Sequence, residues 1–285
     1  MSAVGIMQGR LSVPVDGRIQ AFPRDAWRNE FEAAALAGMD FIEWIYDAYG
    51  SDVNPIGQPA GIAELKALQD RHGIPLRSVC ADYFMEYPLL KCSLPERQER
   101  IAVLAQLFDW SRSLDVKYIV LPFVDSSRID NEDEANDFVT LMIQSILPLA
   151  EKYGIEAHLE TSLAPNDVAS VLDRIPHPLF WINYDSGNSS SLGYRPDVEF
   201  DAYGARIGSF HIKDRICGGT TVPLGTGDAD FAALNRCLAR TNYQRAFVLQ
   251  VARGETGNEI ELARHNKAYA FEHIIPAEGA TWNSA

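Results

Sequence analysis

Short apolar runs and longer segments with helical periodicity alternate along the whole chain. Runs of this length, bounded by turn residues, are typical of buried strands. We expect eight strands, over residues 3–7, 40–46, 75–81, 117–124, 155–160, 180–185, 207–214 and 246–252. The predicted helices cover residues 25–37, 60–72, 94–114, 132–153, 165–175, 228–241 and 258–273, with a weaker helical pattern over 196–206. The repeating unit is therefore a strand followed by a helix.

Local signals mark where several of these helices begin and end. Ser93 and Glu96 form a capping-box pattern, and Asn131 precedes an acidic first turn. A glycine follows directly after three predicted helices, where a left-handed C-terminal cap is needed; these are Gly38, Gly73 and Gly154. The pattern thus predicts helix boundaries as well as helices.

The predicted strands are continuously apolar rather than alternating, which is typical of a parallel sheet covered on both faces by helices. Repeated right-handed β-α units close such a sheet into a barrel, and barrels of about 250 residues are routinely single domains. We predict an α/β fold, a (β/α)₈ TIM barrel, forming one domain over residues 1–285. An open doubly wound sheet is the alternative, but no G-x-G-x-x-G pattern follows the first strand.

Charge and composition narrow the classes of partner. The chain has 39 acidic and 25 basic residues, a formal net charge of −14, which disfavours a long nucleic-acid interface. The N-terminus lacks the basic start and apolar run of a signal peptide, and no stretch approaches the ~20 apolar residues of a membrane span. We expect a cytoplasmic protein with neither membrane nor nucleic-acid partners.

Three successive predicted strands end in a side chain that can bind a metal ion, namely Glu160, Asp185 and His211. In a parallel barrel these ends converge on one mouth, where active sites of this fold are built. Two carboxylates and one imidazole suit Mn²⁺, Mg²⁺, Co²⁺ or Zn²⁺. Each residue could instead be structural, because a strand-end carboxylate can cap the next helix and a single histidine is usually a core residue. Their occurrence at consecutive strand ends favours a metal site.

The eighth strand adds Gln250, which points inward in the register that also turns Val248 and Ala252 inward. Its carbonyl oxygen can bind a metal ion. A neutral amide supplies less charge than a carboxylate, however, and cannot act as a general base near pH 7. Gln250 could alternatively be only a hydrogen-bonding residue in the barrel mouth.

Further polar residues at the predicted strand ends are candidates for substrate contact. The basic ones could hold an anionic or hydroxyl group, or neutralise nearby acids. The glycine turns at 218–219 and 225–227 and the serines at 189–191 predict flexible loops, one of which could form a phosphate nest. The candidate residues are Gln8, Arg10, Glu43, Asp47, Asp82, Lys213, Asp214 and Arg253.

Several motifs resemble the xylose-isomerase-like TIM-barrel superfamily, specifically its sugar-phosphate isomerase/epimerase branch. They are GIMQGRLS at 5–12, IQAFP at 19–23, NYDSGNSSSLGY at 183–194, HIKDR at 211–215 and PLGTGDADF at 223–231. The resemblance covers nearly the whole chain. It implies a divalent metal, Mn²⁺, Mg²⁺ or Zn²⁺, held by Glu160, Asp185, His211 and Gln250. Asn188 stands where some relatives carry a second imidazole, and we expect it to contact substrate. Family barrels often pair, which implies a homodimer.

The resemblance also implies an activity: isomerisation or epimerisation of a small sugar or sugar phosphate through proton abstraction and an enediolate. Glu160 is the expected base, Lys213 or Arg253 would stabilise the enediolate oxygen, and Glu43 or Asp82 could supply a second acid. Family epimerases use glutamates on strands five and eight, on opposite faces of the substrate. Gln250 departs from that pattern.

Three other functions are compatible with a related barrel. An inosose-dehydratase-like lyase would use the same proton abstraction to expel a β-hydroxyl group. An apurinic-site endonuclease would need a histidine-rich zinc cluster and a basic DNA face, whereas this chain has six histidines, mostly away from the strand ends, and is acidic. A sugar-binding relative without catalysis would account for Gln250.

Overall fold

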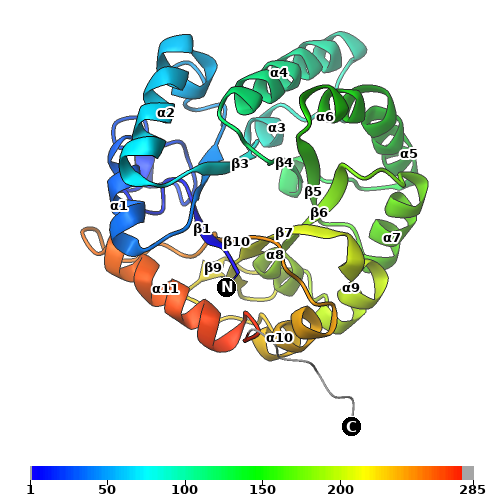
Figure 1. Ribbon diagram of the computed structural model, residues 1–285. Helices are drawn as coiled ribbons and strands as arrows, with labels where there is room; N and C mark the ends of the chain where they lie inside the picture. The colour runs from blue at the N-terminus through cyan, green and yellow to red at the C-terminus, as the bar shows by residue number, and fades with distance from the viewer. Residues whose placement is uncertain (1, 278–285) are drawn as a thin grey trace.

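A computed structural model describes residues 2–277 and shows a closed barrel of eight parallel strands surrounded by helices (Figure 1). The strands hydrogen-bond in chain order, and the last closes onto the first. They are β1 (Val4–Met7), β2 (Ile42–Ile45), β3 (Leu76–Cys80), β4 (Tyr118–Phe123), β5 (Glu156–Thr161), β6 (Phe180–Asp185), β7 (Ile207–Ile212) and β10 (Phe247–Leu249). The predicted (β/α)₈ barrel is confirmed. The predicted domain ends, residues 1 and 278–285, lie outside the described residues.

The helices form the outer ring and match the predicted segments closely. The expected helix over 132–153 is one continuous helical segment in which a π-helical turn, Met142–Ile146, joins α5 to α6. The weaker pattern over 196–206 is helical at α9. The helices of the ring are α1 (Asn29–Ala37), α2 (Pro59–His72), α4 (Leu94–Ser113), α5 (Glu132–Leu141), α6 (Leu147–Tyr153), α7 (Pro165–Arg174), α9 (Pro196–Tyr203), α10 (Phe231–Arg240) and α11 (Glu259–His273).

The predicted caps are present. Ser93 and Glu96 form the capping box of α4, and the Asn131 side chain accepts a hydrogen bond from the third residue of α5. Gly38, Gly73 and Gly154 have φ values of 71°, 67° and 65°, as a left-handed cap requires. These local signals act independently of the rest of the fold, which explains why the chain alone predicts them.

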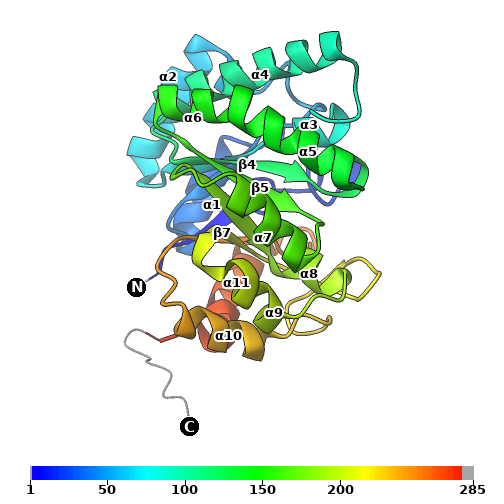
Figure 2. The same cartoon turned by 90° about the vertical axis from the view of Figure 1, so that its right-hand side faces the viewer.

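Short elements at the C-terminal ends of the strands surround the barrel mouth. They are α3 (Tyr83–Glu86), α8 (Ser186–Ser191) and a hairpin of β8 (Asp214–Arg215) and β9 (Thr221–Val222). Figure 2 shows α3 and α8 on the same side of the barrel. The prediction of a flexible loop at Ser189–Ser191 was wrong, because these residues belong to α8. The Ser189 and Ser190 hydroxyl groups are buried, and they donate to the Glu199 carboxylate and the Gly187 carbonyl oxygen respectively.

The barrel interior becomes polar toward the mouth. His158 lies one layer below Glu160, fully buried, where it stacks on Tyr118 at 4.3 Å and hydrogen-bonds to Ser209 at 2.7 Å. Since alternate residues of a strand share a face, Glu160 and His211 lie one layer nearer the mouth than His158 and Ser209. This register places the predicted ligands at the top of the packed interior.

The eighth strand is shorter than predicted, since β10 ends at Leu249. The Gln250 backbone N–H still bonds to the Ile212 carbonyl oxygen at 3.0 Å, so its side chain keeps the inward direction. Ala252 instead lines a small cleft beside Leu262. Within residues 2–277, no helix combines the length and apolar character that a bilayer span requires.

Candidate metal centre

Glu160, Asp185 and His211 come together at the ends of β5, β6 and β7. One ligand atom from each lies within 4.8 Å of the others. His211 Nδ1 is 3.3 Å from Glu160 Oε2 and 4.0 Å from Asp185 Oδ2, and all three side chains are buried. The strand ends therefore converge as a metal site of this fold requires.

Asp185 both caps a helix and faces the centre. Its Oδ1 accepts hydrogen bonds from the backbone N–H groups of Gly187 and Asn188, both at 2.8 Å, which starts α8. Its Oδ2 remains directed toward His211 and lies 3.1 Å from Lys213 Nζ. Capping and metal binding, two alternatives from the sequence, are compatible because they use different oxygens.

Glu43 lies behind His211 rather than in the mouth. Its Oε1 is 2.6 Å from His211 Nε2, and its Oε2 accepts from Ser78 Oγ at 2.5 Å. Glu43 is fully buried and does not line the large cavity described below. A metal-binding histidine usually donates its other ring N–H to a carboxylate in this way, which fixes the tautomer. This pairing turns Nδ1 toward Glu160, with Asn183 Nδ2 at 3.0 Å, so a metal ion bound to Nδ1 would replace that amide contact.

The charges of the centre also suit a divalent cation. Three carboxylates, from Glu43, Glu160 and Asp185, face one ammonium group, that of Lys213, so two negative charges are in excess when His211 is neutral, as a metal-binding imidazole is. Burial lowers the pKa of His211, but the Glu43 and Glu160 carboxylates raise it further, to about 10. Carboxylate oxygens with one imidazole form a donor set suited to Zn²⁺, Mn²⁺ or Mg²⁺. The residues present thus fit the implied metal.

Gln250 lies beside this centre with both ends of its amide engaged. Its Oε1 accepts from Lys213 Nζ at 3.1 Å, and its Nε2 donates to Gln20 Oε1 at 3.1 Å. Lys213 Nζ also donates to Asn188 Oδ1 at 3.2 Å. A role for Gln250 as fourth ligand stays a prediction, because its oxygen would have to be shared with, or released by, Lys213.

A cavity of about 510 Å³ opens above the centre. A small sugar fits this volume, since ligand sites commonly measure about 300–1,000 Å³. Of the candidate residues, those that line it are Arg10, Asp47, Asp82, Glu160, Asn188, Lys213 and Gln250. Gln20 and Arg215 also line it but were not predicted. Gln20 donates to Asp82 Oδ2 at 2.7 Å, and Arg215 Nη1 donates to Asn188 Oδ1 at 3.0 Å. Both lie inside motifs already quoted, IQAFP and HIKDR.

Two candidates for substrate contact make only internal hydrogen bonds. Gln8 Oε1 accepts from the Ile45 backbone N–H at 2.9 Å. Asp214 accepts from the backbone N–H groups of Gly225, Gly227 and Ala229 at 2.9, 2.9 and 3.1 Å. The glycine turn at 225–227, one of the loops considered for a phosphate nest, is therefore filled by the protein's own carboxylate. Neither side chain lines the cavity: Asp214 holds the turn at 225–229, and the Gln8 oxygen binds the backbone of β2.

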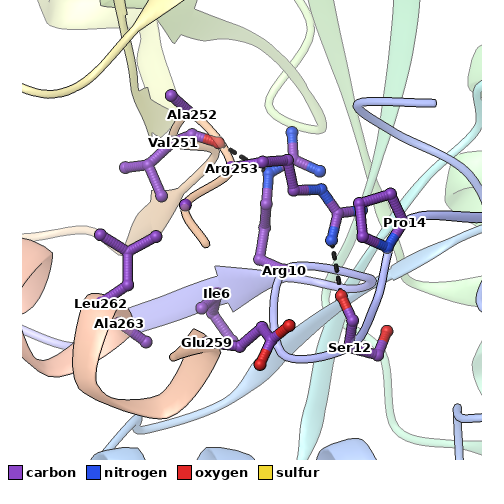
Figure 3. A pocket seen from close by; sticks show the side chains of 11 residues that line it. Ile6, Arg10, Ser12, Pro14, Val251, Ala252, Arg253, Glu259, Leu262 and Ala263 are labelled. Atoms are coloured by element: carbon purple, nitrogen blue, oxygen red, sulfur yellow. Dashed lines mark hydrogen bonds between the residues drawn. The ribbon is translucent and has the colours of Figure 1, made fainter. Parts of the chain in front are cut away.

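Arg253 holds the segment after β1. It donates to the carbonyl oxygens of Gly9, Ser12 and Ile19, the last two at 2.8 and 3.0 Å. Figure 3 shows it beside Arg10, with a dashed bond to Ser12, in a cleft of about 10 Å³ that has room for about one water molecule. Burial and Arg253 together lower the pKa of Arg10 to about 9. The two arginines lie side by side because backbone carbonyls surround them.

Comparison with known proteins agrees with this architecture. The family described as "Xylose isomerase-like TIM barrel" matches residues 31–271. The chain belongs to this family. It is 23% identical over 250 residues to the Haemophilus influenzae protein named "Putative L-ribulose-5-phosphate 3-epimerase SgbU", covering 81% of this chain and 86% of that protein.

Two solved structures superpose on this chain over almost its whole length. The IolI protein with a bound zinc atom superposes with a TM-score of 0.74 at 18% identity, covering 94% of this chain and 97% of that one. D-psicose 3-epimerase from Clostridium cellulolyticum H10, solved with D-tagatose, gives a TM-score of 0.71 at 16% identity, covering 96% and 100%. At these identities the likeness establishes the xylose-isomerase-like fold.

Proposed function

We propose that this protein is a divalent-metal-dependent isomerase or epimerase of a small sugar or sugar phosphate. The proposal rests on the location of Glu160, which belongs to the candidate metal group and also lines the cavity. A base in that place can reach a carbon whose carbonyl oxygen lies at the metal. The relative named as an epimerase and the fold shared with a sugar-bound epimerase support the substrate class.

Glu160, Asp185 and His211 would hold the metal, with Gln250 beside them. When bound, the metal would act as a Lewis acid that polarises the substrate carbonyl and acidifies the neighbouring C–H group. Asn188 Nδ2 donates to Glu160 Oε1 at 2.7 Å and Asn183 Nδ2 donates to Oε2 at 3.2 Å, so the carboxylate that accepts the proton is held in place.

Lys213 is placed to stabilise the enediolate oxygen, because its ammonium group lines the cavity next to Asp185 and Gln250. A fixed positive charge directed at developing negative charge stabilises it better than solvent, which must first reorient, does. We assign Arg253 to support of the segment after β1 and Glu43 to orientation of His211, rather than to substrate contact.

Solvent exchange tests the proposal. Metal-loaded protein is incubated in D₂O with ketoses, aldoses and their phosphates, and deuterium next to the carbonyl is followed by NMR. Wild type should incorporate deuterium. Glu160→Gln should abolish incorporation, and Asp173→Asn, which changes an exposed carboxylate on α7 away from the cavity, should retain it.

Exchange that survives in Glu160→Gln would refute the assignment of the base. Product mass separates the alternatives in the same experiment, since loss of water identifies a lyase. Sugar binding without exchange in wild type would identify a binding protein instead.

A further inference from the structure

Asp82 is the cavity carboxyl group whose surroundings leave it free for proton transfer. It follows β3, whereas Glu160 is the penultimate residue of β5, and both line the same cavity. Gln20 Nε2 donates to Asp82 Oδ2 at 2.7 Å, and Cys80 Sγ donates to Oδ1 at 3.2 Å. Within residues 2–277, no lysine or arginine nitrogen lies within 4.0 Å of this carboxyl group. It is therefore held by neutral donors.

The other acidic side chains of the cavity region are less suitable. Glu43 is buried behind His211. Asp47 uses both oxygens to accept from the backbone N–H groups of Phe22 and Gly50, at 2.7 and 2.8 Å. Asp125 and Glu86 are exposed at the rim. Asp82 is half-buried and has a side chain that only other side chains engage.

A chain of amides orients the donor to Asp82. Gln20 Oε1 accepts from Arg10 Nη2 and from Gln250 Nε2, each at 3.1 Å. Since Arg10 can only donate, the oxygen of the Gln20 amide must face it, and the NH₂ group must face Asp82. A glutamate at position 250 would set its oxygen against that of Gln20. The neutral residue on the eighth strand thus belongs to the arrangement that holds Asp82.

The protonation of Asp82 suits a group that both gives and takes a proton. Burial in the cavity wall raises its pKa to about 6, and the Glu160 and Asp47 carboxylates add to the rise, while the Gln20 and Cys80 hydrogen bonds oppose it. A proton-transfer group works best when its pKa lies near the working pH.

We infer that Asp82 is the second proton-transfer group of the active site, acting on the substrate face opposite Glu160, with Gln20 and Gln250 as positioning residues. The inference rests on the proposed function and narrows it to an epimerase. Glu160 takes the proton from the carbon next to the carbonyl, and the electron pair moves to the carbonyl oxygen as the enediolate. Asp82 in its acid form then returns a proton to the same carbon from the other side, the carbonyl re-forms, and solvent restores both groups.

The test measures deuterium exchange separately for the two epimers of an accepted sugar. In wild type both should exchange and interconvert. In Asp82→Asn the epimer whose proton Glu160 removes should still exchange, whereas conversion should fall by roughly 10²-fold or more. The other epimer should neither exchange nor convert. Glu160→Gln, which also removes a metal ligand, should abolish exchange of both epimers, and Asp173→Asn, an exposed carboxylate on α7 away from the cavity, should behave as wild type.

Gln20→Met tests the positioning role, because it removes the amide that faces Asp82. It should weaken exchange of the same epimer as Asp82→Asn, which a general loss of stability would not do. An Asp82→Asn protein that interconverts the epimers at the wild-type rate would overturn the inference. The inference would also be overturned if folded, metal-binding Asp82→Asn protein lost exchange equally for both epimers. Absence of exchange in wild type would instead overturn the proposed function and the inference with it.

Discussion

At the residue scale, Gly187 decides whether Lys213 can reach the centre. A Cβ atom at this glycine would lie 2.5 Å from Lys213 Cγ and 3.0 Å from its Cβ, closer than side-chain atoms pack. The lysine stem therefore crosses the first turn of α8 only because that turn begins Ser-Gly. Its ammonium group then meets Asp185, Asn188 and Gln250. The missing side chain of Gly187 thus leaves the space that the Lys213 side chain occupies.

Glu43 gives a residue-scale prediction. Glu43→Gln preserves the shape of the side chain but replaces the carboxylate behind His211 with a weaker, neutral acceptor. We expect metal affinity to fall by roughly 10–100-fold, which is the usual effect of removing a carboxylate that orients a metal-binding histidine. Competition with a fluorescent chelator measures this loss. Asp125→Asn should bind as wild type, and an unchanged affinity in Glu43→Gln would remove Glu43 from the metal site.

At the scale of elements, the segment that joins β1 to α1 is tied down by charged side chains from outside it. Glu30 of α1 accepts from the Gly9 backbone N–H at 2.9 Å and from Ser12 Oγ at 2.8 Å, and Arg253 binds the same turn from the other side. Gln20, further along this segment, reaches Asp82 in the cavity. The conformation of the segment is therefore set by partners in α1, in the loop after β10 and in the loop after β3.

Glu30 predicts a pH dependence of stability. Burial raises its pKa to about 7 from 4.5. The unfolded chain therefore loses this proton near pH 4.5 and the folded chain near pH 7. Between these values the folded state holds more protons, so the contribution is present below pH 4.5 and is lost as the pH rises through 7. We expect wild type to lose ~2–3 kcal/mol of unfolding free energy between pH 5 and 8 relative to Glu30→Gln.

Denaturant titration at the two pH values measures this difference. Glu32→Gln, which changes an exposed glutamate on the same helix, serves as the control and should keep the wild-type pH dependence. Equal pH profiles for wild type and Glu30→Gln would show that Glu30 has the same pKa in both states.

At the scale of the whole molecule, the metal centre links three consecutive strands and, through Glu43, a fourth. A ligand that binds only the folded state stabilises it by ~2.7 kcal/mol at 100 times its Kd. For a domain of this size that corresponds to a rise in Tm of roughly 4–5 °C. We expect Mn²⁺ or Zn²⁺ to raise Tm by this amount over protein in EDTA, as measured by calorimetry.

Asp185→Asn separates metal binding from helix capping. Asparagine can still accept from the Gly187 and Asn188 N–H groups, so α8 should begin normally, but the ligand charge is gone. The metal-dependent rise in Tm should therefore shrink sharply while Tm in EDTA changes little. A full rise in this variant would place the metal elsewhere.

The chain itself determines the features that depend on neighbours in sequence. Apolar runs, caps and C-terminal glycines define the strands and helices, and parallel geometry alone brings Glu160, Asp185 and His211 to one mouth. Tertiary structure decides which polar residues are free. Asp214 and Arg253 are taken by backbone groups, Glu43 pairs with a histidine 168 positions away, and Gln20 is drawn to Asp82 from another loop. Hydrogen-bond partners of a buried polar group come from wherever the fold supplies them, so no local pattern can record them.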